Sequence, residues 1–408
     1  MQQQSKIKFD IKLPLILIHT PFGLKFFDNI ARTRAAKYYA KFTTYLMPLI
    51  TALALFLILG AIVTLFSSEI VREGARGIGP QSNLLIPGLN PYLPIAEGWI
   101  ALVLTIIIHE AGHGIVARVH GVKVESTGIV LLLGLPIGAF VNIERDELDK
   151  ISIKQKSSIM TAGPMSNIIL AGISLFFMFL ITSSLSITQP INPNIFGVLV
   201  TGVSPNSLAE TLGLTKGSII QMIQDNEVKT PISLNENLGS NLGKAVSITW
   251  LNENGDKVAK QATLPKEREP GKGILGVTIT EVSDPKKVLD NYNSLFVSNP
   301  LALLAPPTMA QGNVPFSALM HEKYTSPIFG SLFSMPANLF FWLWFINFNV
   351  AIFNALPIGP LDGGQLYNAI IDKKTANRKG ILRHASKILT YGMIIVVALA
   401  FVVPWLMQ

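Results

Sequence analysis

Long stretches without charged residues alternate with short charged segments along this 408-residue chain. Apolar residues dominate five stretches, near 42–68, 96–119, 157–185, 333–356 and 388–406, of which 96–119 also contains Glu97, Glu110 and Arg118. A helix of about 20 apolar residues crosses the ~30 Å hydrocarbon core of a bilayer. The pattern therefore predicts a polytopic α-helical membrane protein with about five spans.

Two regions depart from this helical pattern. The stretch Ser126–Ile143 is apolar but is broken by Gly134, Pro136 and Gly138, which favours a re-entrant or strand-like segment packed against protein. Between residues 195 and 280 charges return and short alternating runs such as "VSITWLN" appear, which is typical of strands. This part is expected to be a soluble β-rich module.

These changes of pattern divide the chain into five parts. They are an N-terminal segment with the first span and an exterior loop (1–95), the first half of a membrane core (96–190), the β-rich module (191–285), a connector (286–332) and the second half of the core (333–408).

Composition agrees with a membrane protein. Hydrophobic residues make up 49% of the chain and charged residues only 14%, against about a quarter in soluble domains. There is no cysteine, which excludes disulfides, thiolate metal ligands and cysteine nucleophiles. The net charge of +8 is attributed to basic flanks that orient membrane helices. The bilayer is thus an expected partner, and nucleic acid is not.

Basic residues also predict the orientation in the cell membrane. Residues 1–41 carry eight Lys and Arg against two Asp, and the loop Asp372–Lys387 carries six against one, so both are expected in the cytoplasm. Five spans then place the β-rich module and the C-terminus outside. The apolar run Leu13–Ile18 is too short for a signal peptide, so the N-terminus is expected to be retained.

The second apolar stretch contains His109-Glu110-Ala111-Gly112-His113, an H-E-x-x-H motif. Residues four apart share one face of a helix, so two imidazoles there can hold one Zn²⁺. Glu110 is rotated by about 100° from His109 and can act as a general base without binding the metal. Ionisable groups within a membrane span mark functional sites, and a bound cation would compensate these three.

A catalytic zinc ion needs a third protein ligand. His120 lies two turns beyond His113, too far for the same ion, and His384 reads as a surface residue of a basic loop. Asp362 in "NALPIGPLDGGQ" ends a 38-residue uncharged run, and Pro357 and Pro360 are expected to unwind the chain there. From the residues alone, Asp362 is either this ligand or an ordinary carboxylate in a turn.

Three motifs in order, HEAGH, "AGPMSN" (Ala162–Asn167) and "FNALPIGPLDGG", together resemble the site-2 proteases, which are intramembrane zinc metalloproteases of peptidase family M50. The resemblance covers about residues 96–185 and 333–372. It implies that His109, His113 and Asp362 bind one zinc ion and that Glu110 is the general base.

The same resemblance implies the roles of other parts. Asn354 would donate to the substrate carbonyl or to the developing oxyanion, and Asn167 would have a polar or packing role. The apolar stretch Gly128–Val141 would correspond to the family's re-entrant segment and would bind the substrate as an added strand. The substrates would be transmembrane segments of other proteins, cleaved in regulated intramembrane proteolysis.

The β-rich module resembles a PDZ domain through "VSPNSLAETLGLTKGSIIQMIQDNEV", Val203–Val228. Ser218 stands where an Asp is usual, and Asn226-Glu227 replaces the usual Asn-Gly hairpin. These departures keep the fold but weaken the expectation that the module binds a C-terminal carboxylate.

Two other functions fit parts of the sequence. A membrane-anchored zinc peptidase acting on soluble or misfolded chains would keep the metal outside the lipid, but HEAGH lies in mid-span. A non-catalytic PDZ scaffold with a structural zinc ion would not need Glu110.

Overall fold

The computed structural model describes most of the chain. It covers residues 7–407 apart from 134, 189–195, 253–254, 268–272, 283, 306, 308–313, 318–319 and 376–383. The expected boundary between residues 190 and 191 lies outside the described residues. The chain divides into two compact units, Met1–Met178 with Pro336–Gln408, and Phe179–Met335.

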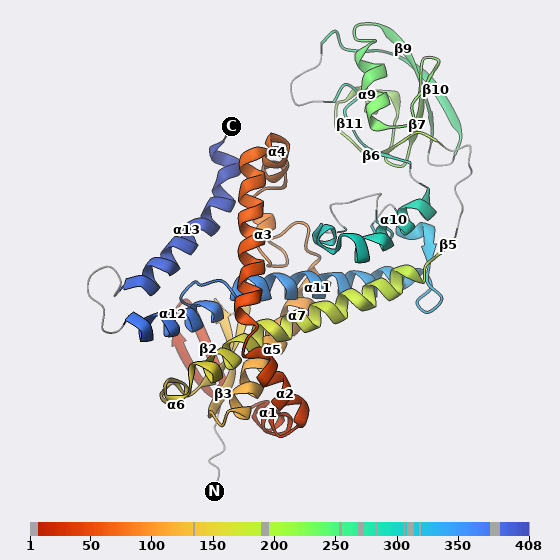
Figure 1. Cartoon of the computed structure of the whole chain (residues 1–408). Helices are drawn as coiled ribbons and strands as arrows, with labels where there is room; N and C mark the ends of the chain where they lie inside the picture. Colours follow the sequence, from red (N-terminus) through yellow and green to blue (C-terminus); the bar gives the residue numbers. More distant parts are fainter. Residues whose placement is uncertain are drawn as a thin grey trace. The chain divides into compact units, whose positions relative to one another are not determined.

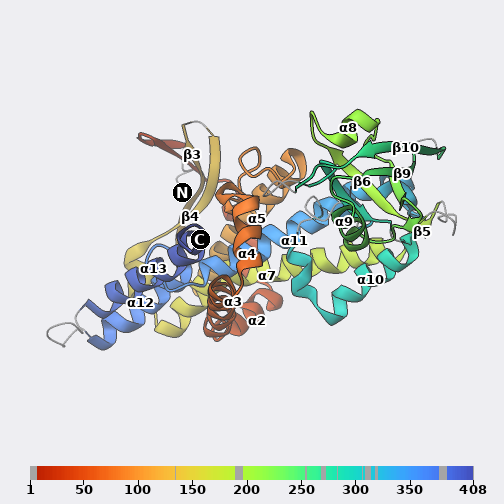
Figure 2. The same ribbon diagram turned by 90° about the horizontal axis from the view of Figure 1, so that it is seen from above.

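Five described helices are long and apolar enough to cross a membrane, which confirms the polytopic helical fold. They are α3 (Met47–Ser67), α5 (Ile95–Val119), α7 (Ile153–Ser183), α11 (Ser334–Asn354) and α13 (Ala385–Leu406). In both views α7 and α11 run alongside each other (Figures 1 and 2), and the rings of Phe177 and Phe340 stack with centroids 5.2 Å apart. Helix α7 continues through Gly163 and Pro164. Membrane helices tolerate proline where neighbouring groups satisfy the freed backbone.

The apolar segment with Gly and Pro breaks forms a β-hairpin. Its strands are β3 (Val124–Leu132) and β4 (Leu135–Ile143). A second hairpin from the N-terminus, β1 (Lys8–Lys12) and β2 (Leu15–Thr20), joins it, so that one sheet has the order β1-β2-β3-β4. The sequence analysis did not predict the N-terminal hairpin, nor that β2 would pair with β3, a strand more than 100 residues away. The last strand, β4, packs on α5.

Several shorter helices were also missed. They are α1 (Leu24–Ala31), α2 (Arg34–Thr43), α4 (Glu69–Ile78), α6 (Arg145–Lys150) and α12 (Asp362–Thr375). Their sequences give local signals: Thr33 caps α2 through the peptide N–H of Ala36, and Ser68 caps α4 through that of Val71. Helix α4 thus lies in the segment that the sequence analysis expected to be a loop.

The second unit contains a six-stranded sheet with the path β10-β9-β7-β6-β11, to which β8 adds beside β7. Its strands are β6 (Val198–Val203), β7 (Ile219–Ile223), β8 (Asn226–Glu227), β9 (Ala245–Leu251), β10 (Lys257–Thr263) and β11 (Val277–Glu281). Ile220, Ile248 and Trp250 lie in its core with the short helices α8 (Leu208–Leu212) and α9 (Pro231–Gly239). The likeness to a PDZ domain stays a prediction.

The expected connector is more ordered than its sequence suggested. It contains most of α10 (Pro285–Ser298), which has Asp284 as its N-cap, and β12 (Tyr324–Thr325), which pairs with β5 (Ser186–Ile187) from outside the connector. Tyr324 is buried and donates a hydrogen bond to the carbonyl of Pro285 at 2.8 Å. This unit therefore continues beyond the β-rich module.

Candidate metal centre

Helix α5 places His109 and His113 on one face, one turn apart. Both side chains are buried, and their Nε2 atoms lie 3.2 Å from each other. Because α5 is a continuous helix from Ile95 to Val119, the four-residue spacing alone fixes this pair.

Asp362 reaches the same point from a distant part of the chain. Helix α11 ends at Asn354, and α12 starts at Asp362 after the segment that contains Pro357 and Pro360. Gly363 and Gly364 make the close return possible, since a Cβ on either would overlap the preceding backbone. The carboxylate Oδ2 lies 3.1 Å from Nε2 of His109 and 3.2 Å from Nε2 of His113.

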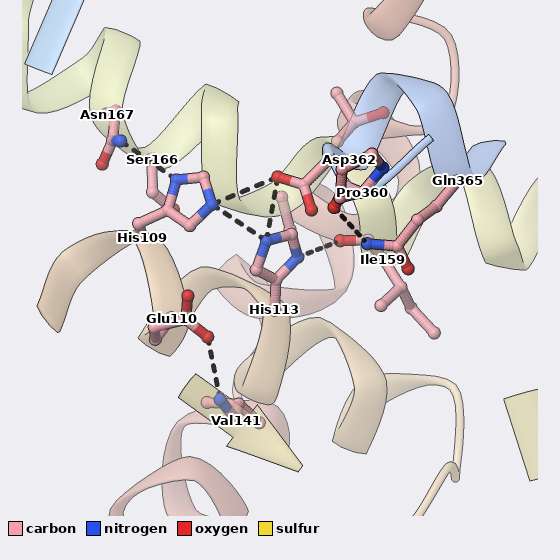
Figure 3. Close-up of polar contacts among 12 residues, drawn as sticks. His109, Glu110, His113, Val141, Ile159, Ser166, Asn167, Pro360, Asp362 and Gln365 are labelled. Atoms are coloured by element: carbon pink, nitrogen blue, oxygen red, sulfur yellow. Dashed lines mark hydrogen bonds and ion pairs between the residues drawn. The ribbon is translucent and has the colours of Figure 1, made fainter. Parts of the chain in front are cut away.

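These three donor atoms fit a zinc ion. They form a triangle with sides of 3.1 to 3.2 Å (Figure 3). Tetrahedral zinc with bonds of about 2.0–2.1 Å separates its ligands by about 3.3 Å. Two imidazole lone pairs and a carboxylate buried together would repel one another, and a cation removes that cost. Among the described residues, this is the one group of three or more such ligands.

Backbone and side-chain groups orient the two imidazoles. Nδ1 of His113 donates to the carbonyl of Ile159 at 2.7 Å, which leaves Nε2 free for a metal. Nδ1 of His109 lies 3.0 Å from the amide nitrogen Nδ2 of Asn167, which is completely buried and whose Oδ1 has no hydrogen-bond partner. A rotation of this amide by 180° would bring Oδ1 to the same point, where it would accept the Nδ1 proton of a metal-binding imidazole. Asn167 thus lies directly against His109, and the polar role that the resemblance implied for it stays a prediction.

Glycines let α7 approach the histidines. A Cβ on Gly112 would stand 2.6 Å from the carbonyl oxygen of Ala162, as expected for a close backbone approach. A Cβ on Gly114 would instead meet the ring of Phe27, a side chain. Gly163 faces the Nε2 atoms of both histidines. Its place in "AGPMSN" is the sequence signal that identifies it.

Tyr39 of α2 was not predicted to belong here. Its hydroxyl donates to the carbonyl of Ala162 at 2.8 Å and lies 2.9 Å from Oγ of Ser166. Burial raises the pKa of the Tyr39 phenol to about 12, and the hydrogen bond with Ser166 partly offsets this shift. A tyrosine that far upstream carries no local signal of its contact with α7.

Glu110 points away from the three ligands. Its Oε2 accepts a hydrogen bond of 2.8 Å from the peptide N–H of Val141 in β4 (Figure 3). Glu110 and Asn354 both line a cavity of about 460 Å³ that also contains His109, His113 and Asp362. The five site residues expected from the sequence therefore lie around one cavity.

Comparison with known proteins identifies the family of the chain. The model of peptidase family M50 matches residues 97–400, about three quarters of the chain. The chain belongs to peptidase family M50. Five apolar helices and this membership make it a multi-pass membrane zinc metalloprotease.

Relatives are found in all three domains of life. The chain is 28% identical to the uncharacterized protein MJ0971 of Methanocaldococcus jannaschii over 89% of this chain and 80% of that protein. It is 24% identical to the putative zinc metalloprotease CPE1693 of Clostridium perfringens, over 67% of this chain and 86% of the relative. It is 23% identical to the membrane metalloprotease ARASP of Arabidopsis thaliana, a chloroplastic protein, over 76% of this chain and 78% of the relative. The name of the Clostridium relative specifies zinc, and zinc is the expected metal of this M50 peptidase.

Proposed function

We propose that this M50 protein is an intramembrane endopeptidase that hydrolyses peptide bonds in transmembrane segments of other membrane proteins. The depth of the metal ligands in α5 carries the proposal. His109 lies fourteen residues after Ile95 and ten before Val119, so that about 21 Å of helix precede it and about 15 Å follow it. A site this far from both helix ends suits a substrate bond within the bilayer.

The proposed roles follow from the positions of the side chains. His109, His113 and Asp362 would hold the zinc ion, which when bound supplies a Lewis acid and lowers the pKa of a water ligand. Glu110 lines the same cavity but is not among the three close ligands, so it would take the proton of the attacking water and pass it to the leaving amine. Asn354 lines that cavity too and would donate to the carbonyl oxygen under attack.

The sheet offers a place for the unwound substrate. A helix protects its peptide bonds by hydrogen bonds within the helix, so it must open before hydrolysis. Strand β4 is the last strand of its sheet, and its residues Ala139 and Val141 line the cavity. An extended substrate could pair with this edge and replace the hydrogen bonds that it loses on unwinding.

The proposed orientation follows the basic residues. Residues 1–41 and the loop Asp372–Lys387 would lie in the cytoplasm, and the β-rich module would lie outside. The site would then open toward the cytoplasm, since His113 lies toward the end of α5 on that side and Asp362 follows the corresponding end of α11.

Reconstitution in liposomes tests the function. The zinc-loaded protein is expected to cleave a reporter transmembrane segment in preference to an unfolded soluble polypeptide. Glu110→Gln should lower cleavage by about 10²–10⁴-fold and keep one zinc ion per chain, because a general base contributes that much. Preference for the soluble polypeptide would favour the membrane-anchored peptidase, and undiminished cleavage by Glu110→Gln would refute the proposed role of this residue.

A further inference from the structure

We propose that the peptide N–H of Val141 holds Glu110 in a resting position, and that a substrate strand pairing with β4 releases it. The general base would thus become available when the substrate is in place. This inference rests on the proposed function and deepens it.

The first observation is the position of Val141 at a sheet edge. Within the described residues β4 pairs with β3 only, and Val141 stands opposite Thr127 in that ladder. In an antiparallel pair, the N–H and C=O of alternate residues point away from the partner strand. Since the N–H of Val141 points to Glu110, it belongs to the outer set, and so does Ala139 two residues earlier. These outward groups face the cavity that contains the metal ligands.

The second observation is that Glu110 already uses this donor. Oε2 of Glu110 accepts from Val141 at 2.8 Å, within the range of a strong N–H···O bond. Figure 3 shows the dashed line from its carboxylate running to Val141, away from the triangle formed by His109, His113 and Asp362. An N–H group has a single proton to donate. A substrate strand that accepts from Val141 must therefore displace Glu110.

Displacement gives the carboxylate a new place in the same cavity. Glu110 follows His109 directly on α5, so a change of side-chain rotamer suffices to turn it from the sheet edge toward the metal side. An incoming carbonyl would satisfy the N–H of Val141, so no buried donor is left without a partner. A peptide too short to pair with β4 would leave Glu110 where it is, and the enzyme would discriminate against it.

A fixed anchoring role is the alternative. In that case the N–H of Val141 would orient Glu110 throughout the reaction, and its removal would slow every substrate. The two roles predict opposite effects on a short peptide, and a backbone change can separate them.

The test replaces the amide of Val141 by an ester, which removes the N–H and keeps the side chain. The matched control is the same change at Ala139, an outward position on the same edge. We expect the ester at Val141 to raise turnover of a short soluble peptide at least about threefold. Both esters should raise KM for the transmembrane reporter, and the ester at Ala139 should not raise short-peptide turnover. Unchanged or slower short-peptide hydrolysis with the ester at Val141 would overturn the inference.

Hydrogen exchange gives a second readout that needs no catalysis. Glu110→Ala should speed exchange of the Val141 amide at least about tenfold, and Glu110→Gln, which keeps an acceptor oxygen, should change it little. An unchanged rate in Glu110→Ala would show that Glu110 does not hold this amide. If the wild type cleaves no transmembrane reporter while exchange responds as expected, the proposed function fails and the resting contact stands.

Discussion

Gly163 packs directly against the imidazole of His113. A Cβ on this glycine would stand 2.7 Å from Nε2 of His109 and closer still to Nε2 of His113. These nitrogens are the atoms that would bind the metal, so the space beside them depends on one missing methyl group. The presence of glycine in "AGPMSN" therefore has a steric explanation: any larger residue would collide with the imidazoles of the metal centre.

Gly163→Ala should weaken zinc binding. The added methyl group must displace at least one imidazole, because both nitrogens belong to rings held by hydrogen bonds on their other side. We expect a loss of about 10–100-fold in zinc affinity, as for changes that misplace metal ligands. Competition with a chelating dye measures it. Gly172→Ala on the same helix is the control: nothing lies within 4 Å of its added Cβ, so its zinc affinity should match the wild type.

Asn167 is expected to influence zinc binding through its side-chain oxygen atom rather than through its volume. Asn167→Leu removes the polar side chain beside Nδ1 of His109, with the oxygen that would accept from it, and is expected to lower zinc affinity by about 10–100-fold. Asn167→Asp keeps an acceptor of nearly the same shape and should retain most of the affinity. Equal losses in the two variants would mean that packing, and not orientation of His109, explains this residue.

Removal of Asp362 should abolish stable zinc binding. Asp362→Ala leaves two histidines, and two ligands do not make a protein zinc site of the usual kind. Metal analysis of the purified variant is expected to show well under one zinc ion per chain after dialysis, and wild type about one. Asp372→Ala, an exposed carboxylate on the same helix, is the matched control. Full zinc content in Asp362→Ala would exclude Asp362 as a ligand.

Tyr39 should stabilise the contact between α2 and α7. Tyr39→Phe removes a hydrogen bond to the carbonyl of Ala162 and is expected to cost about 1 kcal/mol of unfolding free energy. Tyr38→Phe is the control, because Tyr38 is 72% exposed. Thermal unfolding in detergent compares the two.

The raised pKa of Tyr39 also gives a pH dependence. In the folded protein the phenol keeps its proton up to about pH 12, whereas an unfolded tyrosine loses it near pH 10. Its contribution to stability is therefore complete below about pH 10 and is lost as the pH rises through 12. The difference in stability between wild type and Tyr39→Phe should shrink over that interval, and a constant difference would argue against a buried neutral phenol.

The sequence by itself determined the features that depend on local order. Runs of apolar residues predicted the five long helices, and the spacing of His109 and His113 placed both imidazoles on one face of α5. A helix fixes the relation between residues four apart, so these conclusions needed no distant contact.

Tertiary structure decided what depends on distant pairing. It brought Asp362 to His113 across 249 residues, paired β2 with β3, set Tyr39 against α7 and directed Glu110 to Val141. Each of these contacts joins two elements that can each form from their own local sequence. Neither sequence carries a signal of the other element. Their register comes from how helices and strands pack, and no single stretch of the chain encodes that.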